Sequence, residues 1–234
     1  MKLPEKRAVL SLLLKLLVIV SAVGGTYLSY AAGRESFMGG RHVFMYFTIQ
    51  SNLAAALLSL IGLVLLLRKA TPPAWWYTLR FVGAIAITLT GVVFAAILAP
   101  TIGRRARNLQ NTLTHVVVPL AAVLDFFLLG LDHRIPRRHV VFTAIPPLAY
   151  AAYAGIGYLA GWEFARGVRY PYFFLNWDSP AGALGFSREL PFMGVLWWVL
   201  VILLLLLAAG YGYLALLDML RKNRKDESIE QRSL

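Results

Sequence analysis

The stretch that decides the fold is residues 191–218, which read PFMGVLWWVLVILLLLLAAGYGYLALLD. A helix needs about 20 predominantly apolar residues to cross a hydrocarbon core roughly 30 Å thick. This stretch is long enough, and Asp218 is its one charged residue. Five further apolar runs lie outward from it, at residues 8–32, 42–67, 77–99, 112–131 and 139–161. We therefore predict an all-α integral membrane bundle of six transmembrane helices.

The composition of the whole chain agrees with this prediction. Of the 234 residues, 59% are hydrophobic and only 15% are charged, whereas soluble domains are about 45–50% apolar and 25% charged. These values argue against a soluble enzyme, a disordered chain or a collagen-like fibre. The six runs leave little sequence for a separate domain. We predict one transmembrane domain over residues 1–220 and a charged tail over residues 221–234.

The net charge of +12 is explained by where the basic residues lie. They fall in short connections between apolar runs, where Lys and Arg set the orientation of a membrane protein. The termini and the connections on their side hold 14 of them, the opposite connections hold 8, and Lys15 lies within the first run. We expect both termini in the cytoplasm and the protein in the cell's inner membrane. Nucleic acid is not an expected partner.

The sequence offers no expected metal or cofactor. It has no cysteine, which excludes disulfides and thiolate ligands, and no zinc or phosphate-binding motif is present. His42 and His115 are both near one surface and are conceivable haem ligands, but nothing else in the sequence supports a haem. A membrane lipid or lipid ester is the expected partner, and the oligomeric state is left open.

Polar residues at membrane depth are costly and often mark function. The second span carries Thr48, Gln50, Ser51 and Asn52 near its outer end. The fourth span begins with a polar segment that contains Asn111 and His115 and includes Asp125 further along. At 1.5 Å per residue, Thr48 and His115 lie at a similar depth, so they can face each other if the two helices are neighbours.

A hydroxyl beside an imidazole is the smallest nucleophilic pair. Threonine is a weak nucleophile that needs a base within hydrogen-bond reach, and histidine accepts and returns a proton near neutral pH. Asn52 or Asn111 is a candidate to orient the histidine or to bind an oxyanion, and Asp125 needs a partner or a proton. The alternatives are that Thr48 bonds its own helix and that the small polar residues only pack helices.

The longest connection, residues 162–190, is rich in aromatic side chains. It contains Tyr170, Tyr172 and Asn176, which together with Gln50 and Ser51 are candidates for substrate binding. A loop this long and apolar is either a lid over the mouth of the bundle or a cover for polar helix ends.

These residues also carry a family resemblance. Residues 47–52 (FTIQSN), residues 114–119 (THVVVP) with Asp125, and residues 170–176 (YPYFFLN) occur in the order seen in a bacterial family of six-span predicted integral membrane proteins. That family resembles, more remotely, the eukaryotic androgen-induced membrane hydrolases. The resemblance covers nearly the whole chain. Asn176 departs from it, because the bacterial pattern more often has Asp there.

The resemblance implies a reaction. The eukaryotic proteins hydrolyse fatty acid esters of hydroxy fatty acids with an intramembrane threonine and a histidine, which would make Thr48 the nucleophile and His115 the base. We therefore expect an intramembrane lipid ester hydrolase. The alternative is a non-enzymatic lipid or small-molecule binding protein or carrier in which Asp125 is a proton-linked switch. A third possibility is a scaffold protein in which the polar residues only pack helices.

Overall fold

The computed structural model describes residues 5–35, 39–130 and 133–230. Within them the chain is helical, and no strand forms beyond two isolated bridges in the long loop. The elements in chain order are α1 (Glu5–Glu35), η1 (Gly40–Met45), α2 (Phe47–Leu67), α3 (Ala74–Val93), η2 (Phe94–Leu98), α4 (Ala99–Ile102), η3 (Gly103–Ala106), α5 (Leu109–Thr112), η4 (Leu113–Val117), α6 (Val118–Gly130), η5 (Arg137–Ala144), α7 (Ile145–Leu159), η6 (Phe173–Leu175) and α8 (Val195–Glu230).

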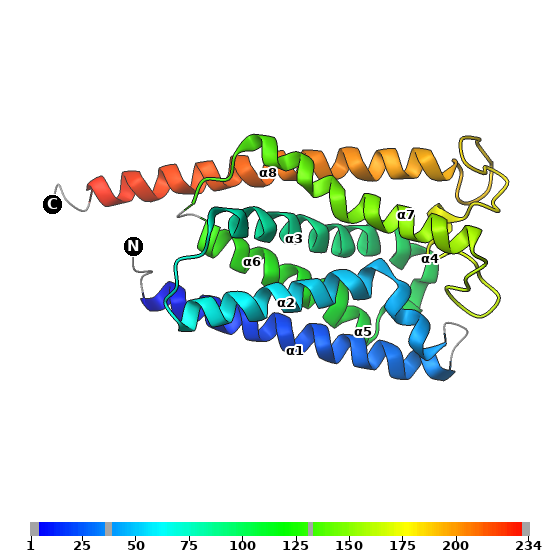
Figure 1. The fold of residues 1–234 in the computed structure, drawn as a ribbon, viewed down its shortest axis with the longest axis horizontal. Coiled ribbons are helices and arrows are strands. Elements are labelled where there is room, and N and C mark those ends of the chain that lie inside the picture. Colours follow the sequence, from blue (N-terminus) through cyan, green and yellow to red (C-terminus); the bar gives the residue numbers. More distant parts are fainter. Residues whose placement is uncertain (1–4, 36–38, 131–132, 231–234) are drawn as a thin grey trace.

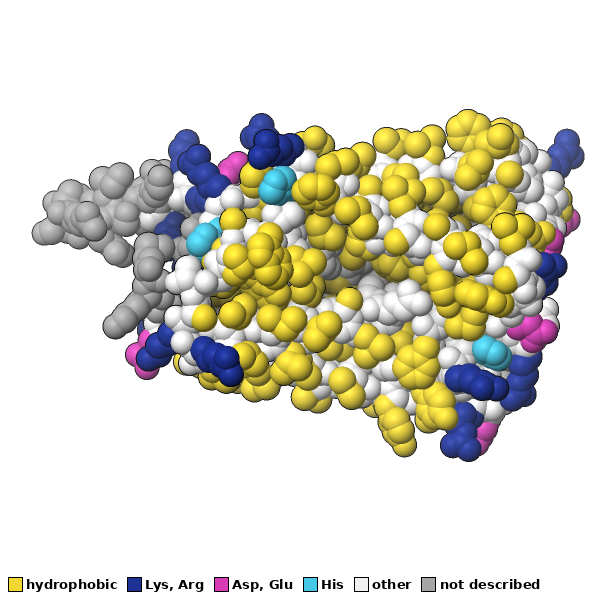
Figure 2. Space-filling view, in the orientation of Figure 1, with side chains coloured by type: hydrophobic (Ala, Val, Ile, Leu, Met, Phe, Trp, Pro, Cys, Tyr) yellow, Lys and Arg dark blue, Asp and Glu magenta, His cyan; other side chains and the backbone are white. Residues whose placement is uncertain are grey.

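Six of the described helical segments are long and apolar enough to cross a membrane, which confirms the predicted class. Consecutive short elements join to give the third, fourth and fifth of them, at Ala74–Ile102, Leu109–Leu129 and Arg137–Leu159. Figure 1 shows the helices running side by side, with both ends of the chain at one end of the bundle. Apolar side chains cover the flank, and Lys and Arg gather at the two ends (Figure 2), as a bilayer requires.

The bundle has two apolar cores. One lies among α1, α2, α3 and α6, and its buried residues are Val18, Ala22, Ala55, Ala56, Ile87, Val118 and Ala121. The other lies among α3, α6, α7, α8 and the long loop, and includes Phe81, Phe126, Phe164 and Phe174. Since α3 and α6 contribute to both, they form the centre of the fold. Small residues dominate the first core and let those four helices approach closely.

Two π turns interrupt the central helices at the same end of the bundle. The Ala99 N–H bonds the Phe94 carbonyl in η2, and the Val118 N–H bonds the Leu113 carbonyl in η4, each five residues back. A proline follows each turn, at Pro100 and Pro119. A proline within a helix removes an N–H and clashes with the carbonyl four residues earlier, so a wider turn relieves both problems. Such turns often occur at functional sites.

The loop from residue 160 to residue 194 folds over the end of the bundle opposite the termini (Figure 1). Apolar side chains anchor it, because Phe164, Phe174 and Leu175 are buried in the second core. At the other end, α8 continues to Glu230, so the predicted charged tail begins as an extension of the last helix. Residues 231–234 of that tail lie outside the described residues.

Candidate active site

The structure brings Thr48 and His115 together. Thr48 is the second residue of α2, and His115 lies in the η4 turn. The Thr48 Oγ1 atom is 3.4 Å from His115 Nε2. This distance is long for a hydrogen bond, but catalytic hydrogen bonds often tighten only when substrate is bound. The adjacency on which the sequence prediction depended is therefore present.

The other nitrogen of the imidazole defines which tautomer faces Thr48. His115 Nδ1 lies 3.2 Å from the Asn111 carbonyl oxygen and 3.0 Å from Thr114 Oγ1. A carbonyl only accepts hydrogen bonds, and the Thr114 hydroxyl donates to the Gln110 carbonyl. Both contacts therefore favour a proton on Nδ1. That assignment leaves the lone pair of Nε2 directed at the Thr48 hydroxyl, as a general base requires.

Asn52 joins the two elements that carry the pair. It is fully buried, and its Nδ2 donates to the Thr48 carbonyl at 2.8 Å and to the Thr114 carbonyl at 3.0 Å. One amide group thus connects α2 with η4 next to both functional side chains. The side-chain hydrogen bonds of Asn52 go to backbone carbonyls, and its Oδ1 is buried without a hydrogen-bond partner among the described residues.

Tyr172 brings the long loop to the threonine. Its hydroxyl oxygen accepts from the Thr48 N–H at 3.3 Å and lies 3.4 Å from Thr48 Oγ1. The Tyr172 ring stacks on Phe174 and meets Tyr46 edge to face. Burial raises the pKa of the Tyr172 phenol above its ordinary value of 10.0, so the phenol keeps its proton at neutral pH and can donate it in a hydrogen bond.

Thr48 also lies at the beginning of a long helix. The first N–H groups of a helix have no partner within the helix, and the helix dipole makes this end favourable for negative charge. The Thr48 N–H is one of these groups, and its hydrogen bond runs to Tyr172. An anion formed on a group bound to Thr48 Oγ1 would therefore meet both a phenol and the positive end of α2.

A cavity of about 580 Å³, including its open mouth, adjoins Thr48. Its lining residues come from α2, α3, η2, α7, the loop and α8, and they are Phe47, Thr48, Leu89, Thr90, Val93, Leu98, Pro147, Tyr150, Ala151, Tyr172, Phe174, Leu175, Val199, Ile202 and Leu203. All are uncharged, and the four hydroxyl groups belong to Thr48, Thr90, Tyr150 and Tyr172. This uncharged, mostly apolar lining suits an apolar ligand chain.

The remaining predicted residues divide into two groups. Ser51 lies beside the pair, with its hydroxyl 3.0 Å from the Thr48 carbonyl and 2.7 Å from Thr90 Oγ1. Asn111 contributes through its carbonyl, while its side chain donates to Ala106. Gln50, by contrast, is exposed and donates to the Phe44 carbonyl.

Two loop residues also lie away from the Thr48 hydroxyl. Asn176 Oδ1 accepts from the Asp178 N–H at 3.0 Å, which is a turn-forming contact. Tyr170 is half-buried and lies near Tyr46. Neither residue lines the cavity beside Thr48. Of the three loop residues predicted to bind substrate, Tyr172 is the one that reaches Thr48.

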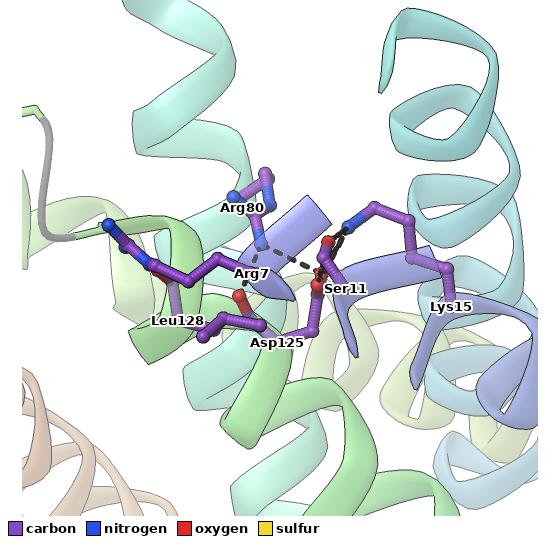
Figure 3. A network of polar contacts seen from close by, with 6 residues as sticks. All are labelled: Arg7, Ser11, Lys15, Arg80, Asp125 and Leu128. Atoms are coloured by element: carbon purple, nitrogen blue, oxygen red, sulfur yellow. Dashed lines mark hydrogen bonds and ion pairs between the residues drawn. The ribbon is translucent and has the colours of Figure 1, made fainter. Parts of the chain in front are cut away.

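Asp125 belongs to a different cluster. It lies ten residues after His115, about 15 Å along the helix. Its carboxylate is 2.7 Å from Lys15 Nζ and 2.9 Å from an Arg80 guanidinium nitrogen, and it accepts from Ser11 at 2.6 Å (Figure 3). A buried carboxylate needs a partner, and Lys15 of α1 and Arg80 of α3 provide it. The structure does not bring Asp125 to the threonine–histidine pair.

Sequence reasoning missed several residues of the site. Phe94 stacks on His115, Tyr150 lines the cavity, and Thr114 and Thr90 complete the hydrogen bonds. Pro100 and Pro119 were the available signal: Pro119 lies within an apolar run and Pro100 directly follows one, and each predicts an irregular turn. Aromatic and threonine side chains are too frequent in such spans to stand out.

The residues described contain no group of three or more side chains that could hold a metal ion. Comparison with family models, with curated proteins and with solved structures found no match to this chain. The geometry of the Thr48–His115 cluster and of its cavity therefore carries the functional argument.

Proposed function

We propose that this protein is an intramembrane hydrolase of lipid esters, with Thr48 as the nucleophile and His115 as the general base. The observation that carries the proposal is the Thr48 Oγ1 to His115 Nε2 contact, next to an uncharged cavity. The resemblance to membrane hydrolases of fatty acid esters of hydroxy fatty acids supports the same assignment.

The first half of the reaction forms an acyl-threonine. Thr48 Oγ1 attacks the ester carbonyl carbon, and its proton passes to His115 Nε2. The carbonyl oxygen becomes an oxyanion, which the Tyr172 hydroxyl stabilises as a hydrogen-bond donor next to the positive end of α2. When the carbon–oxygen bond to the alcohol breaks, His115 returns its proton to the leaving oxygen and a free alcohol departs.

The second half of the reaction consumes water. His115 Nε2 takes a proton from a water molecule, whose oxygen attacks the acyl carbon. The bond to Thr48 Oγ1 breaks, and the proton on His115 returns to that oxygen. A fatty acid is released and the threonine is regenerated. The acyl chain occupies the cavity lined by α3, α7 and α8 throughout.

The orientation of the protein is part of this proposal. The excess of Lys and Arg on the side of the termini supports a cytoplasmic location for both of them. Thr48, His115 and the loop would then face the outer leaflet of the inner membrane, from which a lipid ester enters sideways. In this arrangement the loop that carries Tyr172 limits the access of water.

Turnover of lipid esters by the purified protein tests the proposal. Thr48→Ala and His115→Ala should each lower kcat by at least about 10³-fold, as loss of a nucleophile or its base does. The matched control is Thr78→Ala, because Thr78 Oγ1 lies 2.8 Å from His139 Nδ1 in a second threonine–histidine contact, and neither residue lines the cavity beside Thr48. Turnover of both site variants at the rate of the unaltered protein would refute the proposal.

A further inference from the structure

The second cluster at membrane depth holds more positive than negative charge. Two cationic side chains, Lys15 and Arg80, pair with the one carboxylate among the residues drawn in Figure 3, that of Asp125, whereas Arg7 donates to the Leu128 carbonyl. Lys15 is 1% exposed, and the side chains of Arg80 and Asp125 are 10% and 7% exposed. A net positive charge removed from water is costly unless an anion balances it.

Arg80 has hydrogen-bonding capacity to spare. Its Nη2 donates to both the carboxylate and the backbone carbonyl of Asp125. Nη1 and Nε of Arg80 make no hydrogen bond to the described part of the chain. Neither of these two nitrogens is one of the fully buried side-chain atoms that lack a hydrogen-bond partner. A guanidinium carries five N–H donors in a planar fork that fits phosphate and carboxylate groups.

A cavity adjoins this guanidinium. It measures about 360 Å³ with its open mouth and is lined by Ala55, Leu58, Ser59, Arg80, Gly83, Ala84, Ala122, Asp125 and Phe126. Most of these are small residues of α2, α3 and α6, so the space results from missing side-chain volume next to a charged group. It is separate from the cavity at Thr48, with which it shares no lining residue.

The position of this cavity indicates where a ligand comes from. Arg80 lies six residues after the first residue of α3, about 9 Å along the helix, so it is near one end of the membrane-spanning segment Ala74–Ile102. The apolar side chains of Leu57, Ile61, Leu79 and Leu124 are exposed on the same three helices. The acyl chains of a lipid pack against such an apolar surface, whereas a soluble anion has no affinity for it.

We propose that the cavity between α2, α3 and α6 binds the phosphate of an anionic phospholipid, with the free donors of Arg80 as its main contact. Basic pockets between transmembrane helices are known sites for such headgroups. Lys15 adds positive charge, while Asp125 holds Arg80 and Lys15 in place. This site does not depend on the proposed hydrolysis, so Thr48→Ala should bind the lipid as the unaltered protein does.

The test measures lipid retention and thermal stability of the full chain. The protein is placed in nanodiscs of phosphatidylcholine with or without phosphatidylglycerol, and retained lipid is measured by native mass spectrometry. Phosphatidylglycerol should be retained in preference to phosphatidylcholine and should raise the Tm. Arg80→Gln should reduce this preference by about tenfold or more, because losing hydrogen bonds to a charged group weakens binding by about that factor.

Two further variants keep the test decisive. Ala122→Leu fills the cavity but leaves every ion pair in place, so it should also abolish the preference even if Arg80→Gln fails to fold. Arg68→Gln is the matched control, since Arg68 is an exposed basic residue at the same end of the bundle, and it should retain the preference.

Three results would overturn the proposal. One is the absence of any preference for phosphatidylglycerol. Another is an equal loss in Arg68→Gln and Arg80→Gln, which would indicate diffuse surface charge. The last is a Tm increase from inorganic phosphate alone, in detergent without anionic lipid, that equals the increase from phosphatidylglycerol, because the site would then belong to a soluble anion.

Discussion

The ring of Phe94 stacks on the imidazole of His115, with 3.8 Å between the ring centroids and 19° between the ring planes. Each residue lies in a π turn, Phe94 in η2 and His115 in η4. Gly91 allows the two elements to approach, because a Cβ at that position would lie 3.1 Å from the His115 carbonyl oxygen. The aromatic contact and the Nδ1 hydrogen bonds together hold the plane of the imidazole.

Replacing Phe94 tests whether this stacking positions the base. Phe94→Leu keeps an apolar side chain but removes the flat surface, so the imidazole gains rotational freedom and kcat should fall by about tenfold, with little change in KM. Steady-state kinetics on a lipid ester measure kcat and KM separately. Phe142→Leu is the matched control, because Phe142 packs near His139. Equal kcat values for Phe94→Leu and the unaltered protein would exclude a positioning role.

Tyr172→Phe removes one hydroxyl from the site and leaves the ring contacts in place. If the phenol donates to the oxyanion, kcat should fall by about 10²-fold, while thermal stability stays within about 1 kcal/mol of the unaltered protein. Stopped-assay turnover and a thermal melt measure the two quantities. Tyr170→Phe, in the same loop, should keep full activity. A loss of stability without a loss of kcat would make Tyr172 purely structural.

Asn52→Leu should reduce both stability and turnover. The substitution preserves volume but removes the side-chain donor of the Thr114 carbonyl, which costs about 1–3 kcal/mol for a buried group, whereas the Thr48 carbonyl keeps the Ser51 hydroxyl. Unfolding in mixed micelles measures the stability change, and Gln50→Leu on the exposed face of the same helix is the control. We expect Gln50→Leu to behave as the unaltered protein, and an equal effect of both variants would contradict the bridging role.

The charged cluster gives a prediction about folding. Asp125→Asn leaves Lys15 and Arg80 buried without a counter-charge, which should destabilise the protein by about 3–5 kcal/mol. Lys15→Met should cost less, because Asp125 keeps its ion pair with Arg80. Unfolding in mixed micelles measures both. If Lys15→Met were the more damaging variant, the carboxylate would not be the centre of this cluster.

The sequence predicted the class of the fold because apolar length is a direct requirement of the bilayer. The run at residues 191–218 needed no tertiary information, and its helix begins at Val195. The boundaries were less accurate where irregular turns join helices. Residues 139–161 were predicted as one continuous span, but residues 137–144 form the tighter turns of η5 before α7 begins.

The site was predicted in part, since Thr48 and His115 were expected at equal depth and lie in contact. Which helices are neighbours cannot be read from one span at a time, so the partners of Asp125 were not predicted. Lys15 and Arg80 lie within the predicted runs 8–32 and 77–99, in helices α1 and α3. Which neighbouring helix each side chain faces depends on how the helices pack, and hydropathy contains no information about packing.

The most direct test of the central claim is covalent trapping of the nucleophile. A lipid-like fluorophosphonate is incubated with the purified protein, and the modified residue is found by peptide mass spectrometry. We predict a single adduct on Thr48 that is absent from Thr48→Ala and slowed by at least about 10²-fold in His115→Ala. An adduct at another residue, or equal labelling of Thr48→Ala and the unaltered protein, would contradict the assignment of Thr48 as the nucleophile.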